Sequence, residues 1–273
     1  MKKRILSAIV LSTLILGVVG LTGCGNKKSS NESKANKTTI IVGASPEPHK
    51  EILEKVKQIL EKKGYKLEIK VFTDYVIPNT ALEEGEIDAN FYQHIPYLEQ
   101  FNKEKGTHLT HIAKVHLEPM GIYSKKVKSV NEIKEGATIA VPNDPTNESR
   151  ALRLLEKQGI IKFKEGQIIT KLDIKENPKN IKIQELEAAQ LPRTLTDVDA
   201  ALINTNYALP AGLNPLKNAL AIEDKDSPYA NVIAVKEDNK DKEYIKELKE
   251  AVNSPEVKKF IEDNYRGSII PSF

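Results

Sequence analysis

The chain has 273 residues, of which 41 are Lys or Arg and 38 are Asp or Glu, with one cysteine and no tryptophan. The formal net charge of +3 equals the charge of Lys2, Lys3 and Arg4, and residues 1–23 contain no Asp or Glu. The remaining chain is electrically balanced, which argues against a nucleic-acid partner. A single cysteine cannot form an internal disulfide, so the fold must depend on its hydrophobic core.

The beginning of the chain has the pattern of a lipoprotein signal peptide, expected over residues 1–23. An uncharged apolar run of 17 residues, Ile5 to Leu21, follows the basic residues, and small residues then lead to Cys24. This run is at the short limit for a membrane-spanning helix, which favours cleavage before Cys24 over an uncleaved anchor. In such lipoproteins the cysteine carries a diacylglyceryl group. We therefore expect a lipid anchor at Cys24, on the extracytoplasmic face of the cell membrane, and a flexible polar tether over residues 24–37.

After the tether, strand and helix patterns alternate, which predicts an α/β fold with a largely parallel sheet. The apolar run 38–44 predicts a buried strand, and Ser45 is suited to cap a helix that ends at Gly64. The next elements are expected as strands at 67–71, 87–91 and 109–117, and as helices at 78–84 and 95–105.

A second α/β run begins near residue 125, where Ser129 and Glu132 have the spacing of a capping box. Its elements are expected as strands at 137–141, 181–186, 199–203 and 231–235, a helix after the turn 142–147, a helical turn at 190–195, and final helices at 242–252 and 255–264. Connections near 121–125 and 226–231 suggest two lobes with a cleft between them. The expected boundaries are 38–123 with 228–273 for lobe I, and 124–227 for lobe II.

Aromatic residues gather around the segment from Ile87 to Tyr97. Six of the fifteen Phe and Tyr residues lie between positions 72 and 101: Phe72, Tyr75, Phe91, Tyr92, Tyr97 and Phe101. Polar residues, including Gln93 and His94, are interleaved with them. Aromatic faces with a few placed polar groups are typical of a small-molecule pocket. A core strand that continues into a helix would have a similar composition.

Three further segments place polar side chains where α/β proteins bind ligands. Arg150 lies in the first turn of an expected helix, where its guanidinium could hold both oxygens of a carboxylate, although a surface arginine is the alternative. Asn204 follows a strand and would lie at the carboxyl edge of a sheet. Asn231 ends the segment Ser227-Pro228-Tyr229-Ala230-Asn231. The last two segments could equally be ordinary turns.

The histidines raise the question of a metal site. His108 and His111 are three apart in an expected strand and so face opposite sides, whereas His116 and Glu118 share a face. The sequence contains no phosphate-binding loop, no G-x-G-x-x-G and no G-x-S-x-G. We expect no cofactor, metal or catalytic residue. The competing functions are a secreted, lipid-anchored hydrolase using Asp or Glu in the cleft, and a metal-binding lipoprotein using His94, His116 and Glu118.

Taken together, these residues resemble the methionine-binding lipoproteins of the MetQ/NlpA family, the substrate-binding components of ABC importers. Ten segments carry the resemblance in register after the Cys24 signal: 73–79 (TDYVIPN), 87–90 (IDAN), 93–94 (QH), 121–124 (GIYS), 141–147 (VPNDPTN), Arg150, 176–180 (ENPKN), 190–193 (QLPR), 203–205 (INT) and 227–229 (SPY). The resemblance implies a two-lobed fold of the periplasmic-binding-protein type II-like class, with the ligand enclosed between the lobes. It also implies that the chain is not an enzyme.

The resemblance further implies ligand and partners. The expected ligand is L-methionine, with D-methionine or a methionyl dipeptide as alternatives, delivered by a monomer to a membrane permease that a cytoplasmic ATPase drives. The positions that match the family's ligand-binding residues are Tyr75, Tyr92, His94, Tyr97, Asn147, Arg150, Asn204 and Asn231. Glu118 is a further candidate. Tyr92 stands where the family usually has Phe, so its hydroxyl must find a partner or face the ligand.

Overall fold

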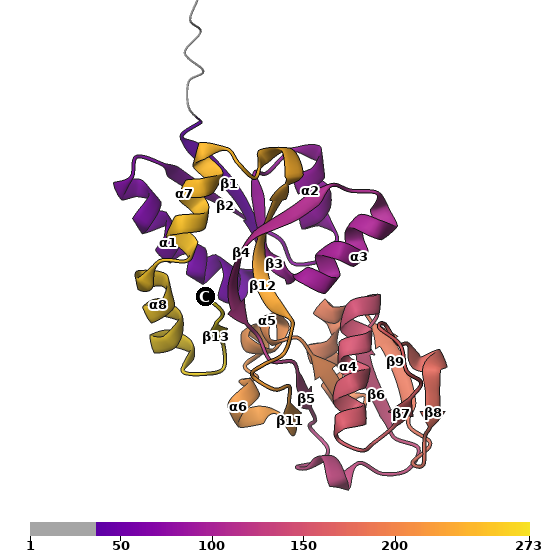
Figure 1. The fold of residues 1–273 in the computed structure, drawn as a ribbon. Helices are drawn as coiled ribbons and strands as arrows, with labels where there is room; N and C mark the ends of the chain where they lie inside the picture. Colours follow the sequence, from indigo (N-terminus) through magenta and orange to yellow (C-terminus); the bar gives the residue numbers. More distant parts are fainter. Residues whose placement is uncertain (1–36) are drawn as a thin grey trace, which may run out of the picture. The chain divides into compact units, whose positions relative to one another are not determined.

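The computed structural model describes residues 37–273, so the predicted signal peptide and the lipidation of Cys24 lie outside the described residues. The described chain is built on two larger β-sheets and a two-stranded ribbon. Figure 1 shows the two sheets, with the first formed by the ends of the sequence and the second by its middle. No helix between residues 37 and 273 has the length and apolar character needed to cross a membrane.

Lobe I is the part built on the six-stranded sheet, in the order β13-β4-β12-β3-β1-β2. The strands are β1 (Thr39–Ala44), β2 (Lys66–Val71), β3 (Ala89–His94), β4 (Leu109–Leu117), β12 (Ala230–Lys236) and β13 (Ile270–Pro271). Strand β1 is parallel to β2 and β3, whereas β12 lies between β3 and β4 and is antiparallel to both. The prediction of a largely parallel sheet is wrong, because β12 returns from the second lobe and enters this sheet in the opposite direction.

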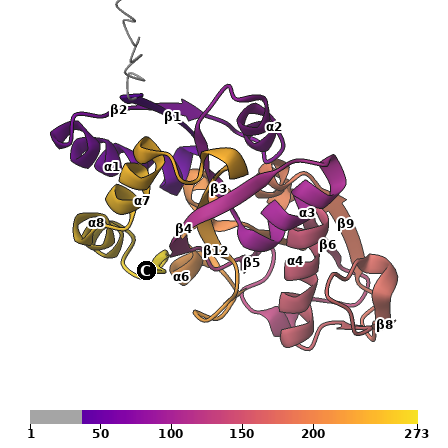
Figure 2. The same ribbon diagram turned by 45° about the horizontal axis from the view of Figure 1, so that its top comes forward.

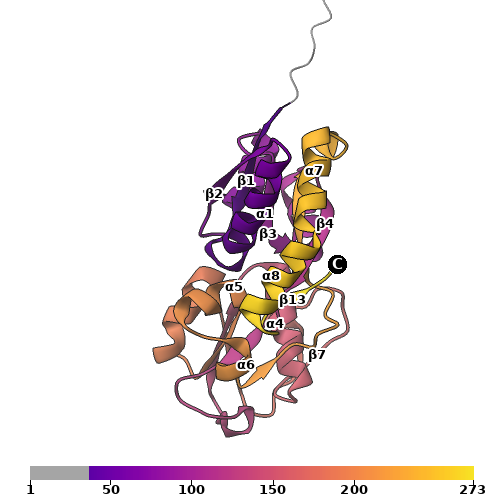
Figure 3. The same ribbon diagram turned by 90° about the vertical axis from the view of Figure 1, so that its left-hand side faces the viewer.

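Helices cover both faces of the lobe I sheet. They are α1 (Glu51–Lys62), α2 (Ile77–Glu84), α3 (Ile95–Lys105), α7 (Glu243–Val252) and α8 (Pro255–Tyr265). Strand side chains alternate between faces, so Ile40 and Val42 pack with α1, α7 and α8 while Ile41 packs with α2 and α3. Figure 3 shows α7 and α8 beside α1, in agreement with their contacts.

Lobe II is the part built on the five-stranded sheet, in the order β11-β5-β10-β6-β9. The strands are β5 (Gly121–Tyr123), β6 (Thr138–Pro142), β9 (Lys182–Leu186), β10 (Ala200–Ile203) and β11 (Ala221–Ile222). Helix α4 (Pro145–Lys157) packs its apolar face on this sheet, with Leu152 and Leu155 fully buried. Further elements include the ribbon β7 (Lys162–Phe163) and β8 (Ile174–Glu176), a 3-10 segment at Ala188–Thr196, and the short helices α5 (Thr205–Ala208) and α6 (Pro215–Asn218).

Two segments link the sheets. One lies between β4 and β5, at residues 118–120, and the other between β11 and β12, at residues 223–229. Strand β5 pairs with β10 in the second sheet, so the first link comes before the expected boundary at residue 123. The exact limits of the lobes otherwise stay a prediction. Figure 2 shows α3 beside α4, and contacts between these helices join the two lobes.

Two predicted helix caps are not formed. The side chain of Ser45 makes no cap hydrogen bond, and its hydroxyl instead contacts His49 within the irregular helical turn Pro46–Lys50 that precedes α1. The hydroxyl of Ser129 contacts the side chain of Glu132 rather than a backbone N–H. Glu47 has non-helical backbone angles at the start of the first segment, and the second is a three-residue 3-10 turn, so the cap geometry of a regular helix does not develop at either place.

Candidate functional site

A cavity lies where the two lobes meet. It is lined by Tyr75, Tyr92, Gln93, His94, Tyr97, Glu118, Asn147, Arg150, Asn204, Thr205, Asn206 and Asn231. The structure thus brings together all eight predicted ligand-binding positions, and Glu118 with them. The lining side chains come from the loop before α2, the ends of β3 and β10, the first half of α3 and α4, the short helix α5, the first linking segment and the start of β12. This is the sheet-edge position at which α/β proteins commonly bind ligands.

Three tyrosines form one wall of the cavity. The rings of Tyr75, Tyr92 and Tyr97 lie 5.8–6.0 Å apart, centroid to centroid. The hydroxyls of Tyr92 and Tyr97 both donate to the carbonyl oxygen of Tyr75, at 2.9 and 2.7 Å. The Tyr75 hydroxyl donates to Oδ1 of Asn206 at 2.6 Å. The Tyr92 hydroxyl has therefore found a partner inside the protein, and this wall offers ring faces and edges to the cavity.

His94 joins the aromatic wall to lobe II. Its Nδ1 accepts from the backbone N–H of Tyr97 and so caps α3, and its Nε2 lies 3.2 Å from Oδ1 of Asn147. This pattern makes His94 a neutral donor to Asn147. Burial, together with the positive charge of Arg150, lowers the pKa of His94 to about 3. Asn147 is held in turn, because its Nδ2 donates to Asp144 and its Oδ1 accepts from Asn204 at 2.8 Å.

Arg150 lies on α4 and is 3% exposed. Its Nε donates to Oε1 of Glu223 at 2.7 Å, and its Nη2 bonds Oε2 of the same carboxylate. Nη2 also donates to the carbonyl of Glu118 at 2.6 Å, and the guanidinium stacks on the ring of Tyr229. The two-oxygen contact that was predicted for a ligand carboxylate is therefore made with the carboxylate of Glu223. Among the described residues Nη1 donates to no acceptor, and Arg150 is one of the residues that line the cavity.

Asn204 and Asn206 each carry a polar atom with no partner. Oδ1 of Asn204 and Nδ2 of Asn206 are buried and form no hydrogen bond within residues 37–273. Both residues line the cavity. A buried polar atom without a partner costs about 1–3 kcal/mol, so a ligand that supplies the partner would recover this energy.

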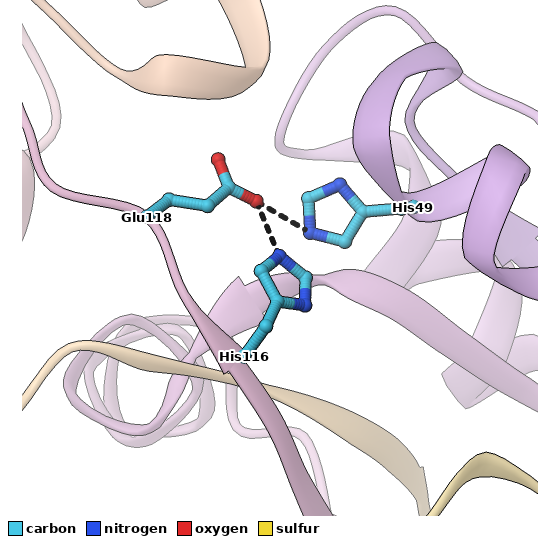
Figure 4. Close-up of side chains that lie close together, drawn as sticks. All are labelled: His49, His116 and Glu118. Atoms are coloured by element: carbon cyan, nitrogen blue, oxygen red, sulfur yellow. Dashed lines mark hydrogen bonds and ion pairs between the residues drawn. The ribbon is translucent and has the colours of Figure 1, made fainter. Parts of the chain in front are cut away.

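Behind the cavity wall, Glu118 meets two histidines. Figure 4 shows the rings of His49 and His116 facing the same carboxylate oxygen, at 3.2 and 2.7 Å from their Nε2 atoms. These three side chains are the group in the described chain whose donor atoms could converge on a metal. The expected alternative set of His94, His116 and Glu118 is wrong in one member, since His49 and not His94 completes the group.

Burial governs the protonation of this group. It lowers the pKa of His49 to about 4 and that of His116 to about 3, so both rings are neutral at pH 7. Burial raises the pKa of Glu118, while His49 and Arg150 act in the opposite direction.

Comparison with known proteins assigns the fold and the family. The sequence profile described as NlpA lipoprotein matches residues 40–273. The chain belongs to the NlpA lipoprotein family. It is 49% identical over 248 residues to the D-methionine-binding lipoprotein MetQ of Salmonella typhi, covering 89% of each protein. It is 44% identical to Lipoprotein 28 of Escherichia coli K12, covering 96% of each.

Solved structures of similar proteins agree with this membership. A nutrient-binding protein from Burkholderia cenocepacia, solved bound to methionine, is 50% identical and superposes with a TM-score of 0.84, covering 86% of this chain and all of that one. The predicted α/β, two-lobed periplasmic-binding-protein fold is therefore confirmed.

Several residues of this NlpA-family site were not expected from the sequence. Glu223 follows the two-residue strand β11, and His49 lies in an irregular turn, so neither has a periodic pattern around it. Tyr229 lies in the segment 227–231 and Gln93 in the aromatic segment, whereas Asn206 lies two residues after the predicted Asn204. For these three, the sequence indicated the segment but not the side chain.

Proposed function

We propose that the chain is the substrate-binding protein of an ABC importer, and that it encloses one methionine molecule between its lobes. The observation that carries this proposal is the set of unused polar atoms in the cavity. Within the described chain, Nη1 of Arg150 and Nδ2 of Asn206 are donors without a partner and Oδ1 of Asn204 is an acceptor without one, and the carboxylate of Glu118 lines the same cavity. A zwitterionic amino acid needs donors at its carboxylate and acceptors at its ammonium.

The aromatic wall supports the methionine side chain. A thioether is polarizable and packs favourably against aromatic ring edges. Tyr75, Tyr92 and Tyr97 direct their hydroxyls to protein acceptors and leave their rings for the ligand. The relatives named D-methionine-binding lipoprotein MetQ, and the Burkholderia protein bound to methionine, support the same ligand.

Ligand capture would occur by lobe closure. Hydrogen bonds from Tyr75 to Asn206 and from His94 to Asn147 join the lobes around the cavity. A ligand that contacts both lobes favours the closed form over the open one. We infer that the closed, monomeric protein then delivers methionine unchanged to a membrane permease driven by a cytoplasmic ATPase, while a lipid on Cys24 keeps it at the extracytoplasmic face of the membrane.

Mass spectrometry of the purified mature protein tests the ligand directly. Denaturation should release intact methionine or a methionyl dipeptide at close to one molecule per chain. Calorimetry on protein that has been unfolded, dialysed and refolded should then show binding, with L-methionine tighter than D-methionine and Gly-Met. A protein that holds no such compound and binds none of the three would overturn the proposal, and so would conversion of the ligand during incubation.

The anchor needs a separate experiment. Cells that express the Cys24→Ser variant should release the protein from the membrane fraction, because the thiol that carries the lipid is gone. Variant protein that stays in the membrane fraction would contradict lipidation at Cys24.

A further inference from the structure

Glu118 is the one carboxylate among the described residues that line the cavity. It lies in the first linking segment and is 4% exposed. Its oxygen Oε1 is the common target of His116, from β4, and of His49, from the turn before α1 (Figure 4). His49 and His116 also pack against each other and against Phe91, with ring centroids 4.6–5.2 Å apart. The three side chains therefore form a packed, buried group directly behind the cavity wall.

The hydrogen bonds fix which ring nitrogens carry protons. Nδ1 of His49 lies 2.5 Å from the hydroxyl of Ser45, which can donate to it, so the proton of His49 belongs on Nε2. That N–H faces both Oε1 of Glu118 and Oδ1 of Asn231, at 3.2 and 3.1 Å. Nδ1 of His116 has no partner in the described chain, so the His116 proton belongs on Nε2, beside Glu118. Two neutral imidazoles can thus donate to one carboxylate oxygen, and these hydrogen bonds favour the ionised form of Glu118 against the burial that raises its pKa.

The spacing favours this hydrogen-bonded arrangement over a metal site. In a tetrahedral zinc site with bonds of about 2.05 Å, neighbouring donor atoms lie roughly 3.3 Å apart around a central ion. Here Nε2 of His116 and Oε1 of Glu118 are 2.7 Å apart, which is the distance of a direct hydrogen bond. Oε1 itself occupies the point on which the two rings converge.

Charge balance in the cavity shows what this carboxylate can do. Arg150 is already neutralised by Glu223, with which it forms a two-point ion pair. A ligand ammonium that enters a buried cavity loses its hydration and needs a counter-charge there. Glu118 provides that charge, and His49 and His116 stabilise it with hydrogen bonds rather than with a positive charge that would cancel it.

We propose that His49 and His116 are positioning residues that hold Glu118 as a fixed anion at the cavity wall, and that they thereby make the site select ligands with a free, cationic amino group. The inference rests on the proposed methionine-binding function and deepens it. It distinguishes methionine from methionine derivatives whose nitrogen is acylated or absent, a selection that the aromatic wall cannot make.

The test compares methionine with 4-(methylthio)butanoate, which has the same thioether and carboxylate but no amino group. The decisive variant is His116→Phe, which keeps a ring in contact with Phe91 and removes the N–H. We expect it to weaken methionine binding by at least about fivefold and to change binding of the amino-free analogue by less than about twofold, both measured by calorimetry or competition. His116→Gln, whose amide can still donate to Glu118, should recover part of the loss.

Two controls separate positioning from packing. His111→Phe changes an exposed histidine of the same strand, β4, and should leave both affinities unchanged. In a Glu118→Gln background, His116→Phe should add no further loss for methionine, because the charge it positions is gone. If His116 had a purely structural role, His116→Phe would not change the ratio of the affinity for methionine to the affinity for 4-(methylthio)butanoate.

The outcomes separate the inference from the proposed function. Equal losses for methionine and for the amino-free analogue in His116→Phe would overturn the inference and leave methionine binding established. A wild-type protein that binds the analogue as tightly as methionine would overturn it as well. A wild-type protein that binds neither compound would overturn the proposed function, and the selection for an ammonium would fall with it.

Discussion

The two walls of the cavity differ in how their polar groups are used. On the aromatic wall every tyrosine hydroxyl donates to a protein acceptor: Tyr92 and Tyr97 to the Tyr75 carbonyl, and Tyr75 to Asn206. The second, polar wall is formed by Glu118, Arg150, Asn204 and Asn206. On this wall, Oδ1 of Asn204 and Nδ2 of Asn206 are buried without partners in the described chain. The first wall is therefore complete without a ligand, whereas the second is not.

Because of this difference, the two walls would select a ligand in different ways, one by its shape and the other by its hydrogen-bonding groups. A wall whose hydrogen bonds are satisfied is rigid and can select a ligand only by the space and the ring surface that it offers. A wall with unpaired donors and acceptors rewards a ligand that completes it and penalises one that cannot. We infer that the tyrosines accept the thioether side chain, and that most of the binding energy that depends on ligand chemistry comes from the wall of Arg150, Asn204 and Glu118.

The strongest test of this comparison is Arg150→Ala. We expect methionine binding to weaken by about 1.5–3 kcal/mol, or ten- to a hundredfold, because the ligand carboxylate loses its cationic donor. The variant also leaves Glu223 without its partner, so the double variant Arg150→Met, Glu223→Gln should lose binding without a buried unpaired charge. Arg153→Ala, on the same helix but paired with Glu156 at the surface, is the control. Unchanged affinity by calorimetry in Arg150→Ala would rule out the carboxylate clamp.

Asn204→Ala should have the next largest effect. It removes the unpartnered Oδ1 and also the Nδ2 donor to Asn147, so we expect methionine binding to weaken by roughly 1–1.4 kcal/mol, or about five- to tenfold. Asn253→Ala is a matched control, since its Oδ1 is likewise buried and unpartnered within residues 37–273 but lies beyond the end of α7, away from the cavity. If the two variants have the same effect on affinity, the unpaired atoms of the polar wall have no special role.

The two walls also differ in how far they could be predicted from the amino-acid sequence. Two of the three tyrosines of the aromatic wall, Tyr92 and Tyr97, come from one short stretch, and the expected helix at 95–105 and strand at 109–117 agree with α3 and β4 residue for residue. Local patterns of apolar spacing, proline and glycine determine such elements. The amino-acid sequence alone therefore indicates that the aromatic segment runs from a strand into a helix.

The polar wall depends on contacts between distant parts of the chain. Arg150 and Glu223 are 73 residues apart, and His49 and Asn231 are 182 apart. Neither Glu223 nor His49 lies in a periodic element, so nothing local indicates its partner. The position of β12 between β3 and β4 has the same cause, because sheet order is decided by packing after the chain has crossed between the lobes. Motif resemblance identified Arg150 but not Glu223, which holds it.

His94, at the junction of the walls, predicts a pH dependence of stability. Its pKa is about 3 in the folded protein and near 6.5 in an unfolded chain, so between these values it takes up a proton only on unfolding. The stability it contributes is complete above about pH 6.5 and is lost as the pH falls toward 3, by about 1.4 kcal/mol per pH unit. His49 and His116 act in the same direction, whereas Glu118 and Asp144, whose pKa burial raises, act in the opposite one.

The variant His94→Asn isolates this contribution, because asparagine keeps a side chain that can cap α3 but does not titrate. Urea unfolding at pH 7.5 and pH 5.5 should show that the free energy of unfolding falls less between these two pH values in the variant than in the wild type, by about 1.4 kcal/mol in total, which corresponds to about half a proton on average over this range. Equal slopes would mean that His94 is not held neutral at the junction of the walls.

The smallest expected effect is that of Tyr92→Phe on the aromatic wall. The hydroxyl of Tyr92 donates to the Tyr75 carbonyl, so its loss should cost about 0.5–1.5 kcal/mol of unfolding free energy. Methionine affinity should change by less than about twofold, and the preference between L- and D-methionine should stay the same, because the ring face remains and the hydroxyl does not contact the ligand. Tyr97→Phe, which removes the second hydroxyl from the same carbonyl, should behave alike. A changed stereochemical preference in Tyr92→Phe would mean that this hydroxyl turns to the ligand on binding, and the aromatic wall would then take part in chemical recognition.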